Sequence, residues 1–227
     1  MYTRGKRFLG EHMEEPKLYK GTTILGIVCK DGIVLASEFR ATLGNLIAGK
    51  DIKVYEIEPH LGFAGAGVAG DNQSLAKIMK IETKLFKTRN GRPITVDGAV
   101  SLLSTIMYQY KMYPFISFVV FGGVEADGTP KLYSLDPYGS TMPDKYTANG
   151  SGMQMALGVL DDRYEEGALV KDSLSLAARA ILAGMKRDVF SGDGVDLITI
   201  TKQGFKRLDK SEVEKIIERD KLKEKKK

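Results

Sequence analysis

The chain has 227 residues, 43% hydrophobic and 28% charged, so it is long enough to build a sizeable core in one globular domain. No run approaches the roughly 20 consecutive apolar residues of a membrane span, and residues 1–21 carry charges throughout, unlike a secretory signal. We therefore expect a cytoplasmic protein with no membrane contact. One cysteine, Cys29, cannot form an internal disulfide, and with two histidines, His12 and His60, it leaves too few ligands for the usual zinc sites.

The positive charge gathers at the two ends of the sequence. The net charge is +5, but residues 221–227 hold five lysines and one glutamate, and residues 1–21 hold five basic and three acidic residues. The body, 22–220, is therefore nearly neutral. Blocks of like charge repel one another and stay solvated, so we predict a disordered lysine-rich tail at 221–227 in preference to a nucleic-acid contact.

In chain order, the first predicted element is a β-hairpin. Apolar runs at 24–29 and 33–36 flank Lys30-Asp31-Gly32, and Asp-Gly favours a tight turn because both positions tolerate positive φ. These runs do not alternate with polar residues, which indicates strands covered on both faces. Other apolar runs predict further strands at 53–57, 61–66, 115–124, 131–135, 195–201 and 205–209.

The apolar spacing between these strands predicts helices. Apolar residues within 75–86 and 100–110 recur at the spacing of two adjacent amphipathic helices, and 169–188 shows the same pattern. Ser211 and Glu214 form a capping box, so we expect a last helix to begin there. Strands and helices do not alternate one for one, which favours an α+β fold of two stacked antiparallel sheets between helical layers over a doubly wound fold. One domain, 22–220, is expected.

One glycine-rich motif matches a dinucleotide-binding turn. Residues 65–70 read Gly-Ala-Gly-Val-Ala-Gly after a strand and before a helix. However, Asp71 would repel a pyrophosphate at the helix N-terminus, and no acidic residue closes a second strand about 20 residues on. We therefore expect no cofactor. The small residues would instead allow close approach of a substrate backbone or tight packing of helix on strand.

The available nucleophiles favour an unusual class of hydrolase. A serine triad is disfavoured because His60, the only histidine beyond residue 21, lies in a turn-like setting and is expected at the surface. Cys29 lies in an apolar strand and is expected to be a buried, inert thiol. A hydrolase that uses its own terminal amine as the base needs no histidine, but its hydroxyl must belong to the first residue of the mature chain. Gly21-Thr22-Thr23 could supply that residue, although these residues by themselves favour an ordinary β-branched strand start.

Several segments resemble proteasome β subunits of the archaeal type. They are Gly21 to Gly26, Asp31 to Glu38, Gly65 to Asp71, Gly150-Ser151-Gly152 and Arg187 to Gly194, in the same order as in that family. The resemblance implies a four-layer αββα sandwich of the N-terminal nucleophile hydrolase class. It also implies seven-membered β rings, with other β subunits, stacked between rings of α subunits. A regulatory ATPase would act through the α rings, and the substrates would be unfolded proteins.

The same resemblance implies a role for each matching residue. Residues 1–21 would be a propeptide, removed by autolysis between Gly21 and Thr22. Thr22 would be the nucleophile of a threonine endopeptidase, with its own amine as the base, and Lys53, held by Glu38, would lower the pKa of that amine. The remaining implied roles are hydrogen bonding around the amine by Ser151, Asp188 and Ser191, an oxyanion hole at the backbone N–H of Gly67, and a substrate pocket at Ala41, Gly65, Ala69 and Gln73, roomy because Gly65 is small.

Some positions depart from the family pattern. The interval from Thr22 to Lys53 is about one residue shorter than in the family, so Lys50 is also considered as the cation. A non-catalytic ring subunit that serves assembly is therefore kept as the alternative, although every polar catalytic position holds a competent residue. The other departures are Phe39, Met153, Val189 and Phe190.

Overall fold

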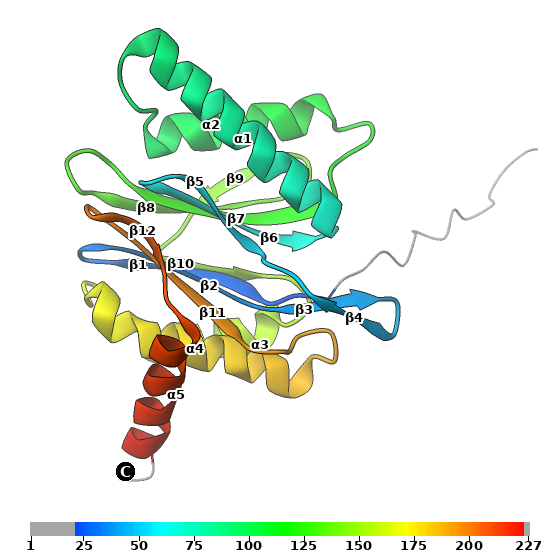
Figure 1. Ribbon diagram of the computed structural model, residues 1–227, viewed down its shortest axis with the longest axis vertical. Coiled ribbons are helices and arrows are strands. Elements are labelled where there is room, and N and C mark those ends of the chain that lie inside the picture. The colour runs from blue at the N-terminus through cyan, green and yellow to red at the C-terminus, as the bar shows by residue number, and fades with distance from the viewer. Residues whose placement is uncertain (1–20, 225–227) are drawn as a thin grey trace, which may run out of the picture.

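The structure is a computed structural model that describes residues 21–224 (Figure 1). The predicted propeptide, apart from Gly21, and the last three lysines lie outside the described residues, so the expectations about them stay predictions. Within the described part of the chain, no helix combines the length and the apolar content needed to cross a bilayer.

The first sheet is antiparallel, has the strand order β10-β1-β2-β11-β12, and carries the predicted N-terminal hairpin at its centre. Strands β1 and β2 pair from Ile24 opposite Ser37 to Cys29 opposite Gly32. Both strands are buried almost throughout, as their continuous apolar runs predicted. The bounds are β1 Ile24–Cys29, β2 Gly32–Glu38, β10 Tyr146–Asn149, β11 Val195–Thr201 and β12 Gly204–Arg207.

The second sheet is also antiparallel, with the order β5-β6-β7-β8-β9. It stacks on the first sheet through an apolar core that includes Ile24, Leu35 and Ile198 on one side and Ala64 and Val120 on the other. Its bounds are β5 Val54–Glu58, β6 Leu61–Gly67, β7 Ser117–Val124, β8 Pro130–Leu135 and β9 Thr141–Pro143.

Helices cover the outer faces of both sheets, as Figure 1 shows. Helices α1 (Ala69–Asn90) and α2 (Val96–Gln109) pack on the second sheet through a core that includes Leu75, Leu103 and Phe121. Helices α3 (Met153–Arg163) and α4 (Val170–Arg187) cover the first sheet. The predicted four-layer αββα sandwich is therefore confirmed.

The elements that the sequence pattern missed are short or poorly buried. Strands β3 (Arg40–Leu43) and β4 (Leu46–Lys50) form a hairpin that projects from the sandwich, and all five residues of β4 are exposed. Helix α3 buries only Ala156 and Leu160, which is too little to create a recognisable period. Strands β9 and β10 have three and four residues.

The last helix, α5 (Lys210–Glu224), begins earlier than predicted. Its capping box is formed by Asp209 and Glu212. The Glu212 N–H donates to Asp209 Oδ1 (2.9 Å) and the Asp209 N–H donates to Glu212 Oε2 (3.0 Å). The predicted box at Ser211 and Glu214 is wrong because Asp209 already holds the N-cap. The helix continues to Glu224, so the predicted start of a disordered tail at residue 221 is also wrong; lysine, leucine and glutamate are good helix formers.

Candidate active site

Thr22 lies just before β1, where a glycine-flanked turn holds its backbone. Its N–H donates to Ser151 Oγ (3.1 Å), and its carbonyl oxygen accepts from the N–H of Gly152 (3.3 Å). Gly150 has a φ of +98°, and a Cβ there would collide with Thr22 O. Glycine is therefore required for the turn to approach this closely. The threonine is 3% exposed, so its position is fixed from several sides.

A chain of hydroxyl groups connects Thr22 to a carboxylate. Ser151 Oγ donates to Asp188 Oδ2 (2.5 Å), and Ser191 Oγ donates to the same oxygen (2.6 Å). Ser191 Oγ also lies 2.8 Å from Thr23 Oγ1. Asp188 is the C-cap residue directly after α4, and this position places its side chain at the turn of residues 150–152. The structure thus brings Ser151, Asp188 and Ser191 together in one hydrogen-bond network, in which Ser151 contacts the nitrogen of Thr22.

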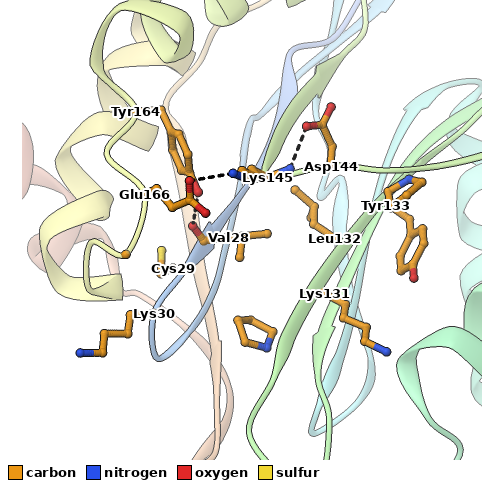
Figure 2. Close-up of a pocket in the computed structure, with 13 residues that line it drawn as sticks. Val28, Cys29, Lys30, Lys131, Leu132, Tyr133, Asp144, Lys145, Tyr164 and Glu166 are labelled. Atoms are coloured by element: carbon orange, nitrogen blue, oxygen red, sulfur yellow. Dashed lines mark hydrogen bonds and ion pairs between the residues drawn. The ribbon is translucent and has the colours of Figure 1, made fainter.

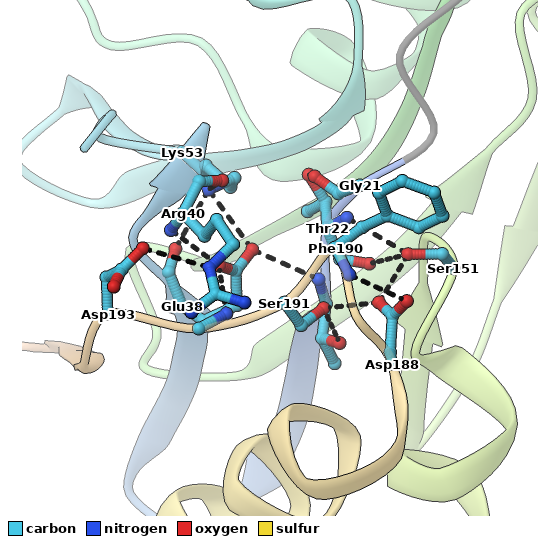
Figure 3. Close-up of polar contacts among 12 residues, drawn as sticks. Gly21, Thr22, Glu38, Arg40, Lys53, Ser151, Asp188, Phe190, Ser191 and Asp193 are labelled. Carbon is cyan, nitrogen blue, oxygen red and sulfur yellow. Dashed lines mark hydrogen bonds and ion pairs between the residues drawn. The ribbon is translucent and has the colours of Figure 1, made fainter. Parts of the chain in front are cut away.

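A buried ion pair lies on the other side of Thr22 in Figure 3. Lys53 Nζ is 3.1 Å from Glu38 Oε1, and the two side chains are 6% and 0% exposed. The lysine also donates to the carbonyl oxygens of Glu38 (3.2 Å) and Arg40 (2.8 Å). All three contacts come from the end of β2 and the residues after it. They hold the ammonium group in one place.

The Glu38 carboxylate is satisfied by backbone donors as well. Its Oε2 accepts from the N–H of Arg40 (2.6 Å) and of Gly192 (2.9 Å), and its Oε1 accepts from the N–H of Thr23 (3.3 Å). Burial raises the pKa of Glu38, while the charge of Lys53 and these N–H groups act in the opposite direction. Donors on both oxygens favour the carboxylate form, so we treat the pair as ionised.

The structure distinguishes between the two lysines considered for this position. Lys50 is exposed at the end of β4, where it pairs with Arg40 across the projecting hairpin. Lys53 directly precedes β5, and its ammonium group reaches Glu38. The shorter interval after Thr22 therefore does not separate Lys53 from the carboxylate.

A cavity of about 280 Å³ opens beside Thr22. Five residues predicted from the resemblance line it together with Thr22, namely Gly21, Ala41, Lys53, Gly67 and Ala69. Gly67 has a φ of +131°, and a Cβ there would collide with Ile116 O. Only glycine fits at this point of the cavity wall.

The other two predicted pocket residues do not line this cavity. The open side of Gly65 is packed against Asn72, since a Cβ on Gly65 would lie 2.5 Å from Asn72 Oδ1. Gln73 follows Asn72 on α1 and is exposed, because successive helical side chains point about 100° apart. The prediction of a roomy pocket at Gly65 is therefore wrong: Asn72 occupies the space. No local sequence pattern indicates this contact, which depends on how α1 packs on β6.

Arg40 is a second residue that sequence reasoning missed. Its Nε donates to Asp193 Oδ2 (3.0 Å) and its Nη1 donates to Val189 O (3.0 Å). Its backbone contacts both members of the Lys53–Glu38 pair. Arg40 thus connects that pair to the loop after α4. Asp193 has a φ of +68°, the only positive φ of a non-glycine residue in the part of the chain that the structure describes.

The departures from the family pattern lie around this site. Val189 is exposed, and so is Met153 at the start of α3. Phe39 lines a separate cavity together with Lys50. Phe190 packs against Gly21, where an added Cβ would lie 2.5 Å from the Phe190 Cβ. The lysine–glutamate pair is formed with all of these residues present.

A second cavity, of about 530 Å³, lies at the other end of β1 (Figure 2). An exposed ion pair joins Lys145 Nζ to Glu166 Oε2 (2.7 Å) at this cavity. Cys29 is 2% exposed, and burial raises the pKa of its thiol to about 11. The prediction of a buried thiol is confirmed. His60 is half-buried, with Nε2 2.8 Å from Ile94 O, so it is less exposed than predicted.

Comparison with known proteins identifies relatives of this chain. The family model described as "Proteasome subunit" matches residues 18–200. The chain is 45% identical to "Proteasome subunit beta" of Methanohalophilus mahii over 91% of this chain and 99% of the relative. It is 43% identical to "Proteasome subunit beta 1" of Thermococcus onnurineus over 87% of this chain and 97% of the relative. It is also 43% identical to "Proteasome subunit beta" of Methanothermobacter thermautotrophicus over 91% of this chain and 99% of the relative.

Proposed function

Because this chain belongs to the proteasome subunit family, with archaeal β subunits among its relatives, we propose that it is a catalytic β subunit of a proteasome core particle. The proposed activity is that of a threonine endopeptidase with Thr22 as the nucleophile. The observation that carries the proposal is the pair of polar groups around Thr22. The Thr22 N–H donates to Ser151, which donates in turn to Asp188. Lys53 is held by Glu38 at the same cavity.

The first proposed step exposes the amine of Thr22. The Thr22 hydroxyl donates to the carbonyl oxygen of Gly21, so it lies next to the bond to be cut. Attack of Oγ on the Gly21 carbonyl carbon breaks the bond to the Thr22 nitrogen and forms an ester, while the nitrogen receives the hydroxyl proton. Water then hydrolyses the ester. The products are a carboxylate at Gly21 and a free Thr22 amine.

The free amine then acts as the general base for other peptides. A terminal amine has a pKa near ~8, and the neighbouring positive charge of Lys53 favours its neutral form near pH 7. The neutral amine takes the proton of Thr22 Oγ as that oxygen attacks a substrate carbonyl. The resulting oxyanion would be stabilised by the N–H of Gly67, and the proton would pass to the departing amine of the substrate. Water would release the acyl group by the reverse sequence of proton transfers.

The proposed partners follow from the same family. The chain would assemble with α subunits and other β subunits into stacked seven-membered rings in the cytoplasm. A regulatory ATPase would deliver unfolded proteins through the α rings. Neither a nucleic acid nor a membrane is among the proposed partners.

The experiment that tests the proposal uses the full chain assembled with α subunits from the same source. We expect the wild-type particle to start at Thr22 by mass spectrometry and to hydrolyse fluorogenic peptides. Thr22→Ala should retain the residues before position 22 and lose hydrolysis, whereas Thr22→Ser should keep both reactions because it keeps the hydroxyl. A wild-type particle that retains its leader and cleaves nothing would instead support the non-catalytic, structural alternative.

A further inference from the structure

We infer that Asn72 selects the substrates of this site, restricting the residue on the acyl side of the scissile bond to small, neutral side chains that carry an oxygen. Serine and threonine are the best examples of this class. The inference rests on the proposed function, because the acyl group in question is the one that Thr22 would receive.

Asn72 is held rigidly between two strands of the second sheet. It lies near the start of α1 and is 4% exposed. Its carboxamide packs against the bare Cα of Gly65 in β6, and its Oδ1 accepts a hydrogen bond from Ser117 Oγ in β7 (2.6 Å). Ser117 itself is fully buried. The side chain therefore cannot swing away without leaving a buried hydroxyl unpaired.

The same side chain forms part of the wall of the cavity beside Thr22. Thr22 Oγ attacks the carbonyl carbon of the residue on the acyl side of the scissile bond. The side chain of that residue must therefore enter the space next to the threonine. The cavity of about 280 Å³ is the space available there, and its other walls include Ala41 and Ala69. The entering side chain therefore meets Asn72.

The size limit follows from what Asn72 fills. Without its carboxamide, the cavity would extend over Gly65, which has no side chain of its own. With the carboxamide present, that extension is closed. A side chain of one to three heavy atoms can end before it reaches Asn72. Leucine or phenylalanine, extended towards Gly65, would overlap with Asn72, which Ser117 holds in place.

The preference for an oxygen follows from the free end of the carboxamide. Ser117 uses one polar atom of the group. Among the described residues, the other polar atom, Nδ2, has no hydrogen-bond partner, and it is not among the polar atoms that are cut off from solvent. A substrate that covers this donor without offering an acceptor leaves it unpaired, which disfavours apolar side chains. A hydroxyl or amide oxygen can accept from it.

A nearby charge excludes acidic side chains from the preferred class. Asp51 lines the same cavity. The two cations of that cavity, Lys53 and Arg40, are already paired with Glu38 and Asp193. A carboxylate entering the cavity would meet the charge of Asp51 without a free cation to balance it. Neutral oxygen-bearing side chains avoid this repulsion.

The test compares peptides that differ only in the residue before the cleaved bond, using the assembled particle with the full chain. For wild type we expect kcat/KM for serine and threonine to exceed that for leucine and phenylalanine at least 10-fold, with alanine between them. Asn72→Ala opens the space over Gly65, so leucine and phenylalanine should gain at least 10-fold relative to serine. Asn90→Ala, the same substitution at the exposed far end of α1, should leave the ratios at the wild-type values.

A second variant separates size from polarity. Asn72→Leu combined with Ser117→Ala keeps the approximate shape of the side chain and removes both hydrogen-bonding groups together. It should still exclude phenylalanine but lose the advantage of serine over alanine. This variant also tests the inference if Asn72→Ala does not assemble. Replacing both hydrogen-bonding partners by apolar groups of similar shape costs little stability.

Two results would overturn the inference while leaving the proposed function intact. One is a wild-type particle that prefers leucine or phenylalanine, and the other is an Asn72→Ala particle with wild-type ratios. Wild type that cleaves none of the peptides, or Thr22→Ala that cleaves them equally well, overturns the proposed function and this inference together.

Discussion

The two ends of strand β1 offer a direct comparison of two buried nucleophilic side chains. Thr22 precedes the strand and is 3% exposed, while Cys29 ends it and is 2% exposed. Polar groups surround Thr22, including Ser151 and the Lys53–Glu38 pair. Cys29 belongs to an apolar cluster under α3 and α4, and burial raises the pKa of its thiol to about 11. A thiol is the stronger nucleophile in isolation, so the surroundings and not the atom type mark the candidate site.

The ion pairs at the two ends differ in the same way. The Lys53–Glu38 pair is almost completely buried and hydrogen-bonded to the backbone. The Lys145–Glu166 pair has side chains 60% and 72% exposed. Water screens the exposed pair, whereas the buried pair keeps its full field at the cavity beside Thr22. Only one end of the sandwich therefore combines a nucleophile with a fixed charge.

The largest predicted difference in kcat/KM between the two ends comes from replacing each nucleophilic residue with alanine. Thr22→Ala should lower kcat/KM by at least about 10³-fold, because the attacking oxygen is lost. Cys29→Ala should leave kcat/KM within about 2-fold of wild type, because the thiol is not ionised near neutral pH. Peptide hydrolysis by the assembled particles measures both. Loss of activity in Cys29→Ala with normal assembly would contradict the assignment of Thr22.

Removing one carboxylate at each end should give the next largest difference. Glu38→Gln leaves the Lys53 charge buried without its partner, so we expect roughly 10²-fold lower kcat/KM and about 3–5 kcal/mol lower stability. Glu166→Gln breaks an exposed pair and should change neither quantity measurably. Hydrolysis rates and denaturant unfolding of the two variants provide the comparison. Equal losses of stability in the two variants would show that burial does not make the Lys53–Glu38 pair contribute more to stability than the Lys145–Glu166 pair.

The Arg40–Asp193 ion pair should have a smaller, salt-dependent effect. Asp193→Asn keeps a residue that tolerates positive φ but removes the charge that binds Arg40. We expect roughly 3- to 5-fold lower kcat/KM at low salt, with the difference shrinking as salt screens the wild-type pair. Asp144→Asn, at the Cys29 end, is the matched control and should have no effect. A loss that does not depend on salt would indicate a structural role instead.

The smallest predicted effect is a pH dependence at Cys29. The pKa of its thiol rises from 9.0 to about 11 in the folded chain because of burial. Between these values the unfolded chain releases the proton that the folded chain retains, so stability falls as pH rises through this window. Urea unfolding of wild type and Cys29→Ala from pH 8 to 11 should show this extra slope only in wild type. Identical slopes would mean that the thiol titrates normally in the fold.

Much of the sandwich could be predicted because its central strands are buried on both faces. Strands β1 and β2 appear as continuous apolar runs around an Asp-Gly turn, and the two long helices α1 and α2 follow the apolar period. The hairpin of β3 and β4 could not be predicted in this way, because strands exposed to solvent carry no burial pattern. The capping box at Asp209 was missed because two overlapping pairs of polar residues satisfied the same pattern.

The order of the buried elements could be read from the amino-acid pattern, and the resemblance to a family indicated which residues to consider around Thr22. Which of these residues are in contact became clear from the three-dimensional structure. In the structure, Lys53 and not Lys50 contacts Glu38. Arg40 binds Asp193, and Asn72 packs onto Gly65. These contacts join residues from different elements, and their formation depends on how helices and sheets pack. A local pattern of apolar and polar residues does not contain that information.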